Sequence, residues 1–567
     1  MPPRRSARAE SAKAAQPERR GRVRKAATSV TDIKHAVKKA TGKQNASSTC
    51  FRTITNTPLG APRGRPKKAT PAVADKPAIG SKRKARDDAD LQPVQKKNRT
   101  RETATKPAKL QPKGPLRRGG KKTIVNELRY TKPLNVFVFG EGGSGELGLG
   151  STKKAIDVKR PRLNEALTNM GVVKVATGGM HVVALTKDNK ILTWGVNDNG
   201  ALGRDTSNAP VKMKDIDEDK DSSDSDSDDD DPGLNEYEAT PTAISEEHFP
   251  ENTVFVDIAA GDSCSFFLTS EGAVYGCGTF RRNEGVLGFA KGIETARTPV
   301  YIDGLKKITQ IACGTNHVLA LDVDNHVWAW GNGQQNQLGR RMTERGIIEG
   351  LVPTRVGFND HSIRRPSKRI AKISCGDYHA FAIAEDGHVW SWGANNYGET
   401  AHTGNAGEDN ASVSTARVAQ ALEGCKVVSI EGGLHHNLAV TSEGEVLVWG
   451  RCDGSQTGLR MDELNAIEDE EVLLKTETTN KPKILIRPTA VPNLKNIATA
   501  ATGPEHSIVI DTNGKAYSWG FSANYQTGQG TDDDIEVPTL IDNSAVRDQK
   551  LVWAGAGGQY SMLASTN

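Results

Sequence analysis

Gly178-Gly179-Met180-His181, followed by Trp194-Gly195, is the stretch that decides the fold of this chain. Gly195 lies seventeen positions after Gly178. The same spacing separates the glycines of five further units, which are Gly261/Gly278, Gly314/Gly331, Gly376/Gly393, Gly433/Gly450 and Gly503/Gly520. The second unit has Cys264 and Cys277 where the others have the histidine and the tryptophan. A fixed internal spacing of this kind indicates a repeat architecture.

The two ends of the array contain complementary half-units. Phe139-Gly140 has the second half of a unit, and Gly557-Gly558-Gln559-Tyr560 has a first half. Six whole units and two halves make seven, and a ring can use the halves by pairing an N-terminal strand into the C-terminal blade. The predicted fold class is therefore all-β. We expect a seven-bladed β-propeller over residues 131–567, closed by a strand around 136–139 that pairs with strands within 551–564.

Short alternating segments within the units are typical of β-strands. Residues 190–194, 326–330 and 445–449 are rich in Val, Leu, Ile and Trp, and they follow turn-forming pairs such as Asp188-Asn189. Blades of this kind bury their faces against each other, so the repeated Trp, Gly and His are expected to be structural. Histidines spread evenly around a ring cannot converge on one metal ion. Neither a metal nor a cofactor is therefore expected.

Charge divides the chain into two unlike parts. Residues 1–130 contain 35 Lys and Arg against 9 Asp and Glu, whereas the remaining residues contain 40 against 60. The basic segment has almost no aromatic residues and is predicted to be a disordered tail. Residues 215–231, rich in Asp and Ser, are predicted to be a disordered acidic insert within the propeller. This insert is either a tolerated surface insertion, or a phosphorylation site or mask for the basic tail. No apolar run near 18 residues is present, so no membrane association is expected.

Two motifs lie in the basic tail. Residues 62–66, with Arg63, Gly64 and Arg65 at the centre, resemble the AT-hook core. Glycine allows a backbone to lie deep in a narrow minor groove, where arginines meet concentrated negative potential. The alternative is a chance match within a basic tail, and we favour a DNA contact. The basic clusters within residues 82–97 have the spacing of a bipartite nuclear-import signal. This spacing predicts nuclear import receptors as partners.

One loop departs from the repeat. After the Trp-Gly glycine, most units place another glycine eight positions on, as in Gly195 and Gly203, but Gly278 is followed by Gly288 at ten. A loop that breaks a strict repeat carries function more often than one that obeys it. Three further residues lie one or two positions after a unit glycine and are expected on one rim of the ring, namely Asp262, Asn316 and His435.

With residues 197–207 and the irregular loop 280–288, the array resembles the regulator of chromosome condensation family, chromatin-bound exchange factors for the small GTPase Ran. The loop is similar to the family's β-wedge, formed here by Phe280, Arg281, Arg282, Asn283, Glu284, Gly285, Val286 and Leu287. The resemblance implies GTPase contacts at Asp262, Asn316 and His435, with Asn316 replacing an aspartate of animal members. It also implies a histone contact at Arg341 and Arg345.

The expected function is therefore guanine-nucleotide exchange on Ran at chromatin in the nucleus. Exchange of this kind is non-covalent, so no hydrolytic or transfer chemistry is expected. The implied partners are Ran, DNA, core histones and import receptors. Two other classes stay open: a chromatin-bound propeller scaffold without exchange activity, and a sugar- or peptide-binding propeller, which the basic tail disfavours. Stimulated release of guanine nucleotide from Ran separates the first two.

Overall fold

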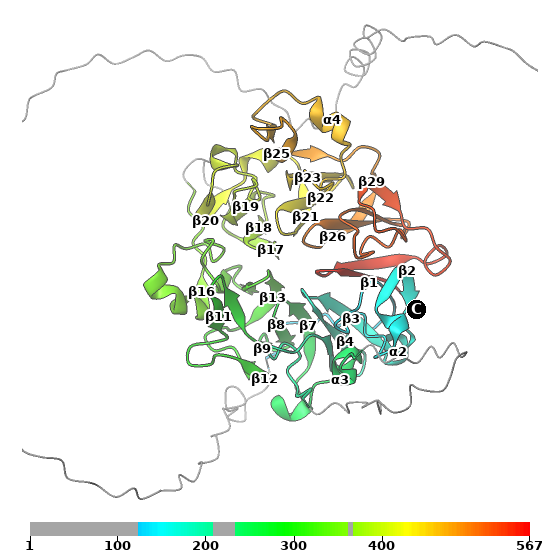
Figure 1. Ribbon diagram of the computed structural model, residues 1–567. Helices are drawn as coiled ribbons and strands as arrows, with labels where there is room; N and C mark the ends of the chain where they lie inside the picture. The colour runs from blue at the N-terminus through cyan, green and yellow to red at the C-terminus, as the bar shows by residue number, and fades with distance from the viewer. Residues whose placement is uncertain (1–122, 208–232, 361–366, 567) are drawn as a thin grey trace, which may run out of the picture. The chain divides into compact units, whose positions relative to one another are not determined.

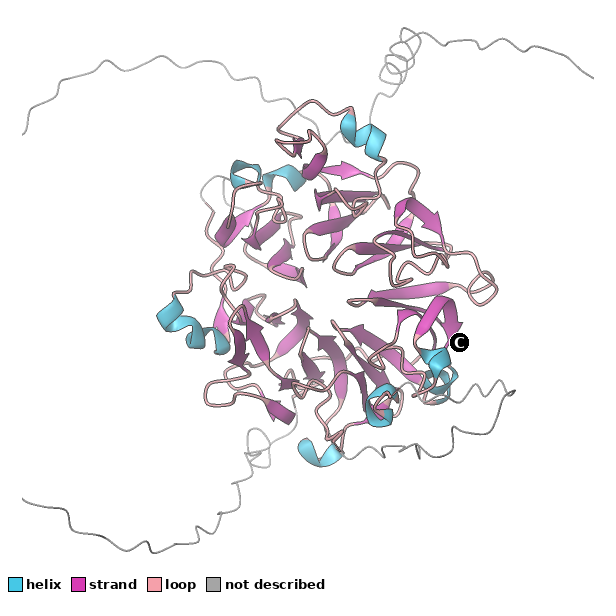
Figure 2. Ribbon diagram, viewed as in Figure 1, coloured by secondary structure: helices cyan, strands magenta, loops and turns pink. Residues whose placement is uncertain are grey.

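The computed structural model describes residues 123–207, 233–360 and 367–566, all within the unit Asn56–Asn567. These residues form seven antiparallel sheets arranged as blades around a central axis (Figures 1 and 2). The all-β, seven-bladed propeller predicted from the repeat is confirmed. Residues 1–122 of the tail, with both of its motifs, and the acidic insert 215–231 lie outside the described residues.

The first three blades follow one plan, in which the innermost strand comes first in the chain. Blade 1 contains β3 (Val172–Thr177), β4 (His181–Thr186), β5 (Ile191–Gly195) and β6 (Thr242–Ala243). Blade 2 contains β7 (Phe255–Ala260), β8 (Cys264–Thr269), β9 (Val274–Gly278) and β12 (Ala296–Tyr301). Blade 3 contains β13 (Ile308–Cys313), β14 (His317–Asp322), β15 (Val327–Gly331) and β16 (Thr354–Arg355).

The next three blades repeat this plan, with one added outer strand in blade 5. Blade 4 contains β17 (Ile370–Cys375), β18 (His379–Ala384), β19 (Val389–Ala394) and β20 (Ser412–Val418). Blade 5 contains β21 (Val427–Gly432), β22 (His436–Thr441), β23 (Val446–Arg451), β25 (Pro482–Ala490) and β24 (Leu473–Lys475). Blade 6 contains β26 (Ile497–Thr502), β27 (His506–Asp511), β28 (Ala516–Gly520) and β29 (Ile535–Leu540).

Helices are short and lie in the connections between strands (Figure 2). The α-helices of the described residues are α2 (Glu165–Asn169), α3 (Glu236–Ala239) and α4 (Met461–Asn465). The 3₁₀ helices are η1 (Lys153–Ala155), η3 (Glu246–His248), η4 (Glu344–Leu351), η5 (Thr403–Asn405) and η6 (Gln420–Leu422). No helix in this part of the chain is both long and apolar enough to cross a bilayer.

Blade 7 joins the two ends of the described chain. β30 (Leu551–Ala556) and β31 (Tyr560–Thr566) form its inner half, and β1 (Leu134–Glu141) and β2 (Asp157–Leu163) form its outer half. β1 pairs with β31 over seven residues, with Val136 opposite Ala564. The closure predicted from the split half-units is therefore confirmed.

Blades 1, 4, 5 and 6 contact both of their neighbours through the repeated residues. The indole N–H groups of Trp194, Trp392, Trp449 and Trp519 donate to carbonyls of the preceding blade at 2.8–2.9 Å. The rings of four repeat histidines contact side chains of the following blade, namely His181–Ser265, His379–Asn437, His436–Ser507 and His506–Ser561. Burial lowers the pKa of His436 and His506 to about 3, so these rings stay neutral near pH 7. They are structural, as the repeat predicts.

The closure yields a stability prediction. Deleting residues 131–140 removes most of β1, which exposes the edge of β31 and the apolar face beneath it. We expect the melting temperature to fall strongly, whereas deletion of residues 1–120 should leave it nearly unchanged. Thermal unfolding followed by circular dichroism measures both variants. Equal melting temperatures for the two truncations would contradict the closure as a stabilising feature.

Candidate functional site

The three residues expected to contact the GTPase, Asp262, Asn316 and His435, lie at one end of the blades. In every regular blade the repeat histidine is paired with the glycine of Trp-Gly, as in His181 with Gly195 and His436 with Gly450. The turn before the histidine and the loop after that glycine therefore emerge at the same end of the blade. We call this end of the propeller the rim face.

Asp262 lies on the rim face in the turn between β7 and β8 and is partly exposed. Its backbone N–H donates to the carbonyl of Thr315 in blade 3, at 3.0 Å. Its carboxylate accepts a hydrogen bond from the Ser263 hydroxyl at 3.0 Å. A Cβ atom on Gly179 would approach the Asp262 Oδ1 atom to 2.5 Å, so glycine at 179 leaves room for this carboxylate. Asp262 is thus held between blades 1 and 3.

His435 lies on the rim face at the turn before β22. Its Nδ1 atom is 2.8 Å from Oε1 of Glu399, a carboxylate that is completely buried. The second oxygen of Glu399 accepts the backbone N–H of Tyr397, also at 2.8 Å. The ring of Tyr397 in turn packs on His435, with centroids 4.3 Å apart. Glu399 and Tyr397 therefore fix the orientation of the imidazole at the surface.

Asp377, in the turn between β17 and β18 of blade 4, lies close enough to both Asp262 and His435 to interact with their charges. It was not predicted from the sequence as a site residue. Its backbone N–H donates to Gly433 of blade 5 at 3.1 Å. Burial raises the pKa of its carboxyl to about 6, against opposing effects of a Thr315 hydrogen bond and the charge of His435. The signal was available, because Asp377 and Asp262 both directly follow the first glycine of their units.

The irregular loop forms a two-stranded hairpin, β10 (Phe280–Arg282) and β11 (Gly285–Gly288), that belongs to no blade. Its base is apolar and buried. The Phe280 ring is fully enclosed and stacks on Phe289, with centroids 5.9 Å apart and planes 6° apart. Its tip is exposed: the Val286 side chain is 39% accessible. A buried base and an exposed tip make the hairpin a projection from the rim face.

The hairpin lies at the boundary between blades 2 and 3, where the described residues do not make the tryptophan and histidine hydrogen bonds seen in blades 1, 4, 5 and 6. Trp330 of blade 3 makes no indole hydrogen bond to blade 2 within the described residues, and instead packs edge-on against Phe266 at 5.6 Å. At the position of the repeat histidine, blade 2 has Cys264, and burial holds the pKa of this thiol well above its usual range. Aromatic packing around the hairpin base therefore replaces the regular hydrogen bonds at this boundary.

Asn316 is placed differently from the other two rim residues. Its side chain is only 8% exposed, and its Oδ1 atom accepts the backbone N–H of Arg281 in the hairpin at 2.6 Å. The resemblance implies that Arg341 and Arg345 contact histones, and both are exposed. Arg341 lies in the loop before η4, and Arg345 is the second residue of η4. The candidates Arg63, Gly64 and Arg65 lie outside the described residues.

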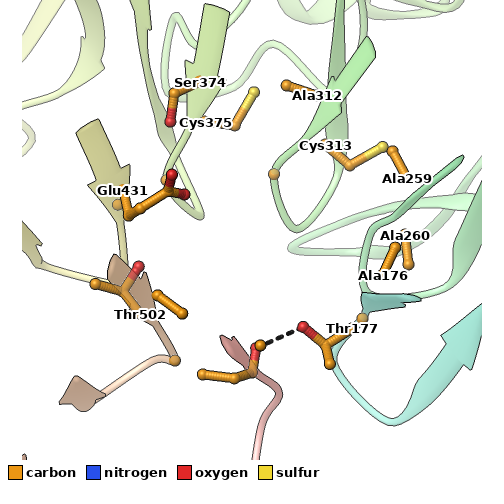
Figure 3. Close-up of a pocket in the computed structure, with 18 of the residues that line it drawn as sticks. Ala176, Thr177, Ala259, Ala260, Ala312, Cys313, Ser374, Cys375, Glu431 and Thr502 are labelled. Atoms are coloured by element: carbon orange, nitrogen blue, oxygen red, sulfur yellow. Dashed lines mark hydrogen bonds between the residues drawn. The ribbon is translucent and has the colours of Figure 1, made fainter. Parts of the chain in front are cut away.

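The axis of the ring contains a cavity of about 870 Å³ lined by the innermost strands of all seven blades (Figure 3). Burial raises the pKa of Glu431, on this wall, to about 7, against the opposing charge of Lys372. Burial also holds the thiol pKa values of Cys313 and Cys375 well above their usual range. These thiols therefore stay protonated, which makes them poor nucleophiles and metal ligands.

Among the described residues, Asp322, Asp324 and His326 bring three metal-ligating side chains within 4.8 Å of one another. The carboxylate of Asp322 is already used within its own turn. Its Oδ1 atom accepts the backbone N–H groups of Asp324 and His326, both at 2.9 Å, and its Oδ2 atom accepts the Trp328 indole N–H at 3.0 Å. The cluster is explained as a hydrogen-bonded turn.

Comparison with known proteins identifies the family. The model of the RCC1-like domain matches residues 135–563. The chain belongs to the RCC1-like domain family. It is 39% identical to the guanine nucleotide exchange factor SRM1 of Saccharomyces cerevisiae over 440 residues, which cover 76% of this chain and 87% of SRM1. It is also similar to protein pim1 of Schizosaccharomyces pombe, with 36% identity over 79% of this chain and 78% of pim1.

A solved structure of this family shares the fold. The crystal structure of Prp20p from Saccharomyces cerevisiae, a protein studied for its binding to Gsp1p and histones, superposes with a TM-score of 0.67. The two chains are 36% identical, and the match covers 77% of this chain and 92% of that one. This RCC1-like domain therefore has a close structural relative as well as relatives in sequence.

The raised pKa of Asp377 predicts a pH-dependent contribution to stability. A carboxyl whose pKa rises from about 3.9 when unfolded to about 6 when folded stabilises the fold at low pH and loses that contribution as pH rises through 6. Asparagine mimics the neutral form. Asp377→Asn should therefore raise the melting temperature at pH 7.5, with a gain that shrinks below pH 6 and vanishes near pH 4. A gain independent of pH would contradict the assignment.

Proposed function

We propose that this chain is a guanine-nucleotide exchange factor for the small GTPase Ran and that it acts on chromatin in the nucleus. The observation that carries the proposal is the hairpin Phe280–Leu287, which projects from the rim face of an RCC1-like propeller. Its relative SRM1 is a guanine nucleotide exchange factor, and the structural relative Prp20p has been studied for binding to Gsp1p and histones.

The mechanism requires no covalent step. A GTPase holds its nucleotide through phosphate contacts and Mg²⁺. A partner that binds the nucleotide-free form more tightly must weaken nucleotide binding by the same coupling free energy. In our proposal the exposed tip of the hairpin acts as a wedge on the phosphate-binding region. Asp262 and His435, both partly exposed on the rim face, hold the GTPase in register.

The basic tail supplies the chromatin contact in this proposal. Residues 1–130 have a large excess of Lys and Arg, which favours binding to phosphate backbones. Arg341 and Arg345 are exposed, and arginine pairs well with acidic protein surfaces such as those of nucleosomes. The bipartite spacing within residues 82–97 of the tail supports a contact with import receptors. A relative, yeast RCC1 (Prp20), has been crystallised bound to Kap60. The two chains are 36% identical, with a TM-score of 0.67 and 77% of this chain and 90% of that one covered.

The wedge yields the central test of exchange. Deleting Asn283 and Glu284 restores the loop to the length of its neighbours and removes the exposed tip. We expect this variant to fold with an unchanged melting temperature but to lose stimulated release of labelled GDP from Ran. A folded variant that releases GDP at the parent rate would remove the wedge from the mechanism and favour the scaffold alternative.

The rim contacts are tested by substitutions matched to their surroundings. Asp262→Ala and His435→Ala should each cost about 1–3 kcal/mol of exchange efficiency if both side chains make partly buried polar contacts. His435→Gln keeps a donor for the buried Glu399 and controls for its loss. His436→Ala, which removes the contact with Ser507 of blade 6, should instead act through the melting temperature. Equal effects of His435→Ala and His436→Ala on both measurements would contradict separate roles.

The tail makes a separate prediction about DNA. It should bind duplex DNA in a salt-sensitive way with a preference for A·T-rich sequence, because narrow minor grooves attract arginine. The double substitution Arg63→Ala with Arg65→Ala should abolish that preference and leave residual binding from the other basic residues. Fluorescence anisotropy with A·T-rich and G·C-rich duplexes at two salt concentrations measures both effects. An unchanged preference in the double variant would exclude the hook.

A further inference from the structure

The base of the hairpin is held by side chains of the neighbouring blade. Arg281, the middle residue of β10, has both of its backbone hydrogen-bonding groups engaged from blade 3. Its N–H donates to Oδ1 of Asn316 at 2.6 Å, and its carbonyl accepts from Nδ2 of Asn332 at 3.0 Å. Two amide side chains thus take the place that a neighbouring strand would have in a sheet. The hairpin is thereby attached to blade 3 in one register.

A third amide reaches the tip of the hairpin. Oε1 of Gln334 accepts the backbone N–H of Asn283 at 3.1 Å, and its Nε2 donates to the carboxylate of Glu284 at 3.2 Å. Gln334 is itself oriented by Asn332, whose Oδ1 accepts the Gln334 backbone N–H at 2.9 Å. The exposed tip of the hairpin is therefore hydrogen-bonded to blade 3.

Apolar packing of the Phe280 ring also restrains the base of the hairpin. Phe280 also stacks on Phe266 of blade 2, with centroids 6.2 Å apart. A Cβ atom added to Gly331 would approach the Phe280 ring to 3.2 Å, so blade 3 closes over the ring. The phenylalanine fixes where the hairpin leaves the propeller. The three amides fix the direction in which it points.

We propose that Asn316, Asn332 and Gln334 are positioning residues for nucleotide exchange, which hold the wedge at one angle against blade 3. This inference rests on the proposed exchange function. It gives Asn316 a role through the hairpin rather than through contact with the GTPase. A side chain that is 8% exposed offers little surface to a partner, and its Oδ1 atom is already bonded to the wedge backbone.

The bond to Arg281 sets what position 316 must provide. Only an acceptor oxygen is needed to meet a backbone N–H, and both an amide and a carboxylate provide one. A negative charge is therefore not required at this position. Alanine has no acceptor and would leave the Arg281 N–H without its partner, which frees the hairpin to change its angle.

The test compares Asn316→Ala with Asn316→Asp in the full chain. We expect the alanine variant to lose about ten- to a hundredfold in the maximal rate of GDP release from Ran, because small misplacement of a working group costs rate at this scale. The concentration of Ran that gives half-maximal rate should change little, since the rim contacts remain. The aspartate variant should restore the rate. Gln334→Ala should give a smaller loss of the same kind.

Hydrogen–deuterium exchange of residues 279–288 reads the anchoring directly. This segment should exchange faster in Asn316→Ala and at the parent rate in Asn316→Asp. The matched control is Gln310→Ala, which removes hydrogen bonds at 3.2 Å from blade 3 to Ile373 of blade 4 and touches no part of the wedge. It should lower the melting temperature without altering the exchange of residues 279–288 or the rate of GDP release.

The possible outcomes separate this inference from the function on which it rests. If Asn316→Ala releases GDP at the parent rate, the positioning role is wrong. If the rate falls while hydrogen exchange of residues 279–288 is unchanged, Asn316 acts by direct contact and the inference is again wrong. If the parent protein does not stimulate GDP release at all, the proposed function fails, and hydrogen exchange alone still decides whether Asn316 anchors the hairpin.

Discussion

The structure depends on one requirement: no blade can bury both of its faces alone. In blades 1, 4, 5 and 6 the sequence meets this requirement with two side chains that contact the neighbouring blades in opposite directions. The tryptophan indole bonds to the blade before, as Trp194 does to Glu146, and the histidine ring contacts the blade after. Where the chain ends, Tyr560 takes the histidine position and donates to the carbonyls of Gly178 and His181, which joins blade 7 to blade 1.

The same requirement explains why the irregular loop occurs where it does. With Cys264 and Cys277 at the histidine and tryptophan positions, blade 2 lacks the ring contact to blade 3 and the indole hydrogen bond to blade 1. The Cys277 thiol still reaches the carbonyl of Ala201 in blade 1 at 3.2 Å, so contact on that side persists. On the other side the space is filled by the rings of Phe266, Phe280 and Phe289. The departure from the repeat and the projecting hairpin therefore occur at the same boundary between blades.

The sequence predicted the blade count and the closure because the glycines recur at fixed spacing and the half-units at the ends are complementary. It placed Asp262 and His435 on one rim because turn positions repeat with the blades. It missed Asp377 even though that residue has the same repeat position as Asp262. It could not foresee the bond between Asn316 and Arg281, because the register of a hairpin against another blade is set by tertiary packing that no repeat encodes.

In the proposed mechanism, the hairpin can distort the GTPase only if the hairpin itself resists bending. Any free energy spent in distorting the hairpin is lost from the coupling that weakens nucleotide binding. In our proposal, the tip derives its stiffness from the amide contacts of the hairpin with blade 3. That blade is held in turn by the next one, where the Trp392 indole donates to Gln337 at 2.9 Å. In the proposed mechanism, closure of the ring is what allows a short surface hairpin to do work on a folded GTPase.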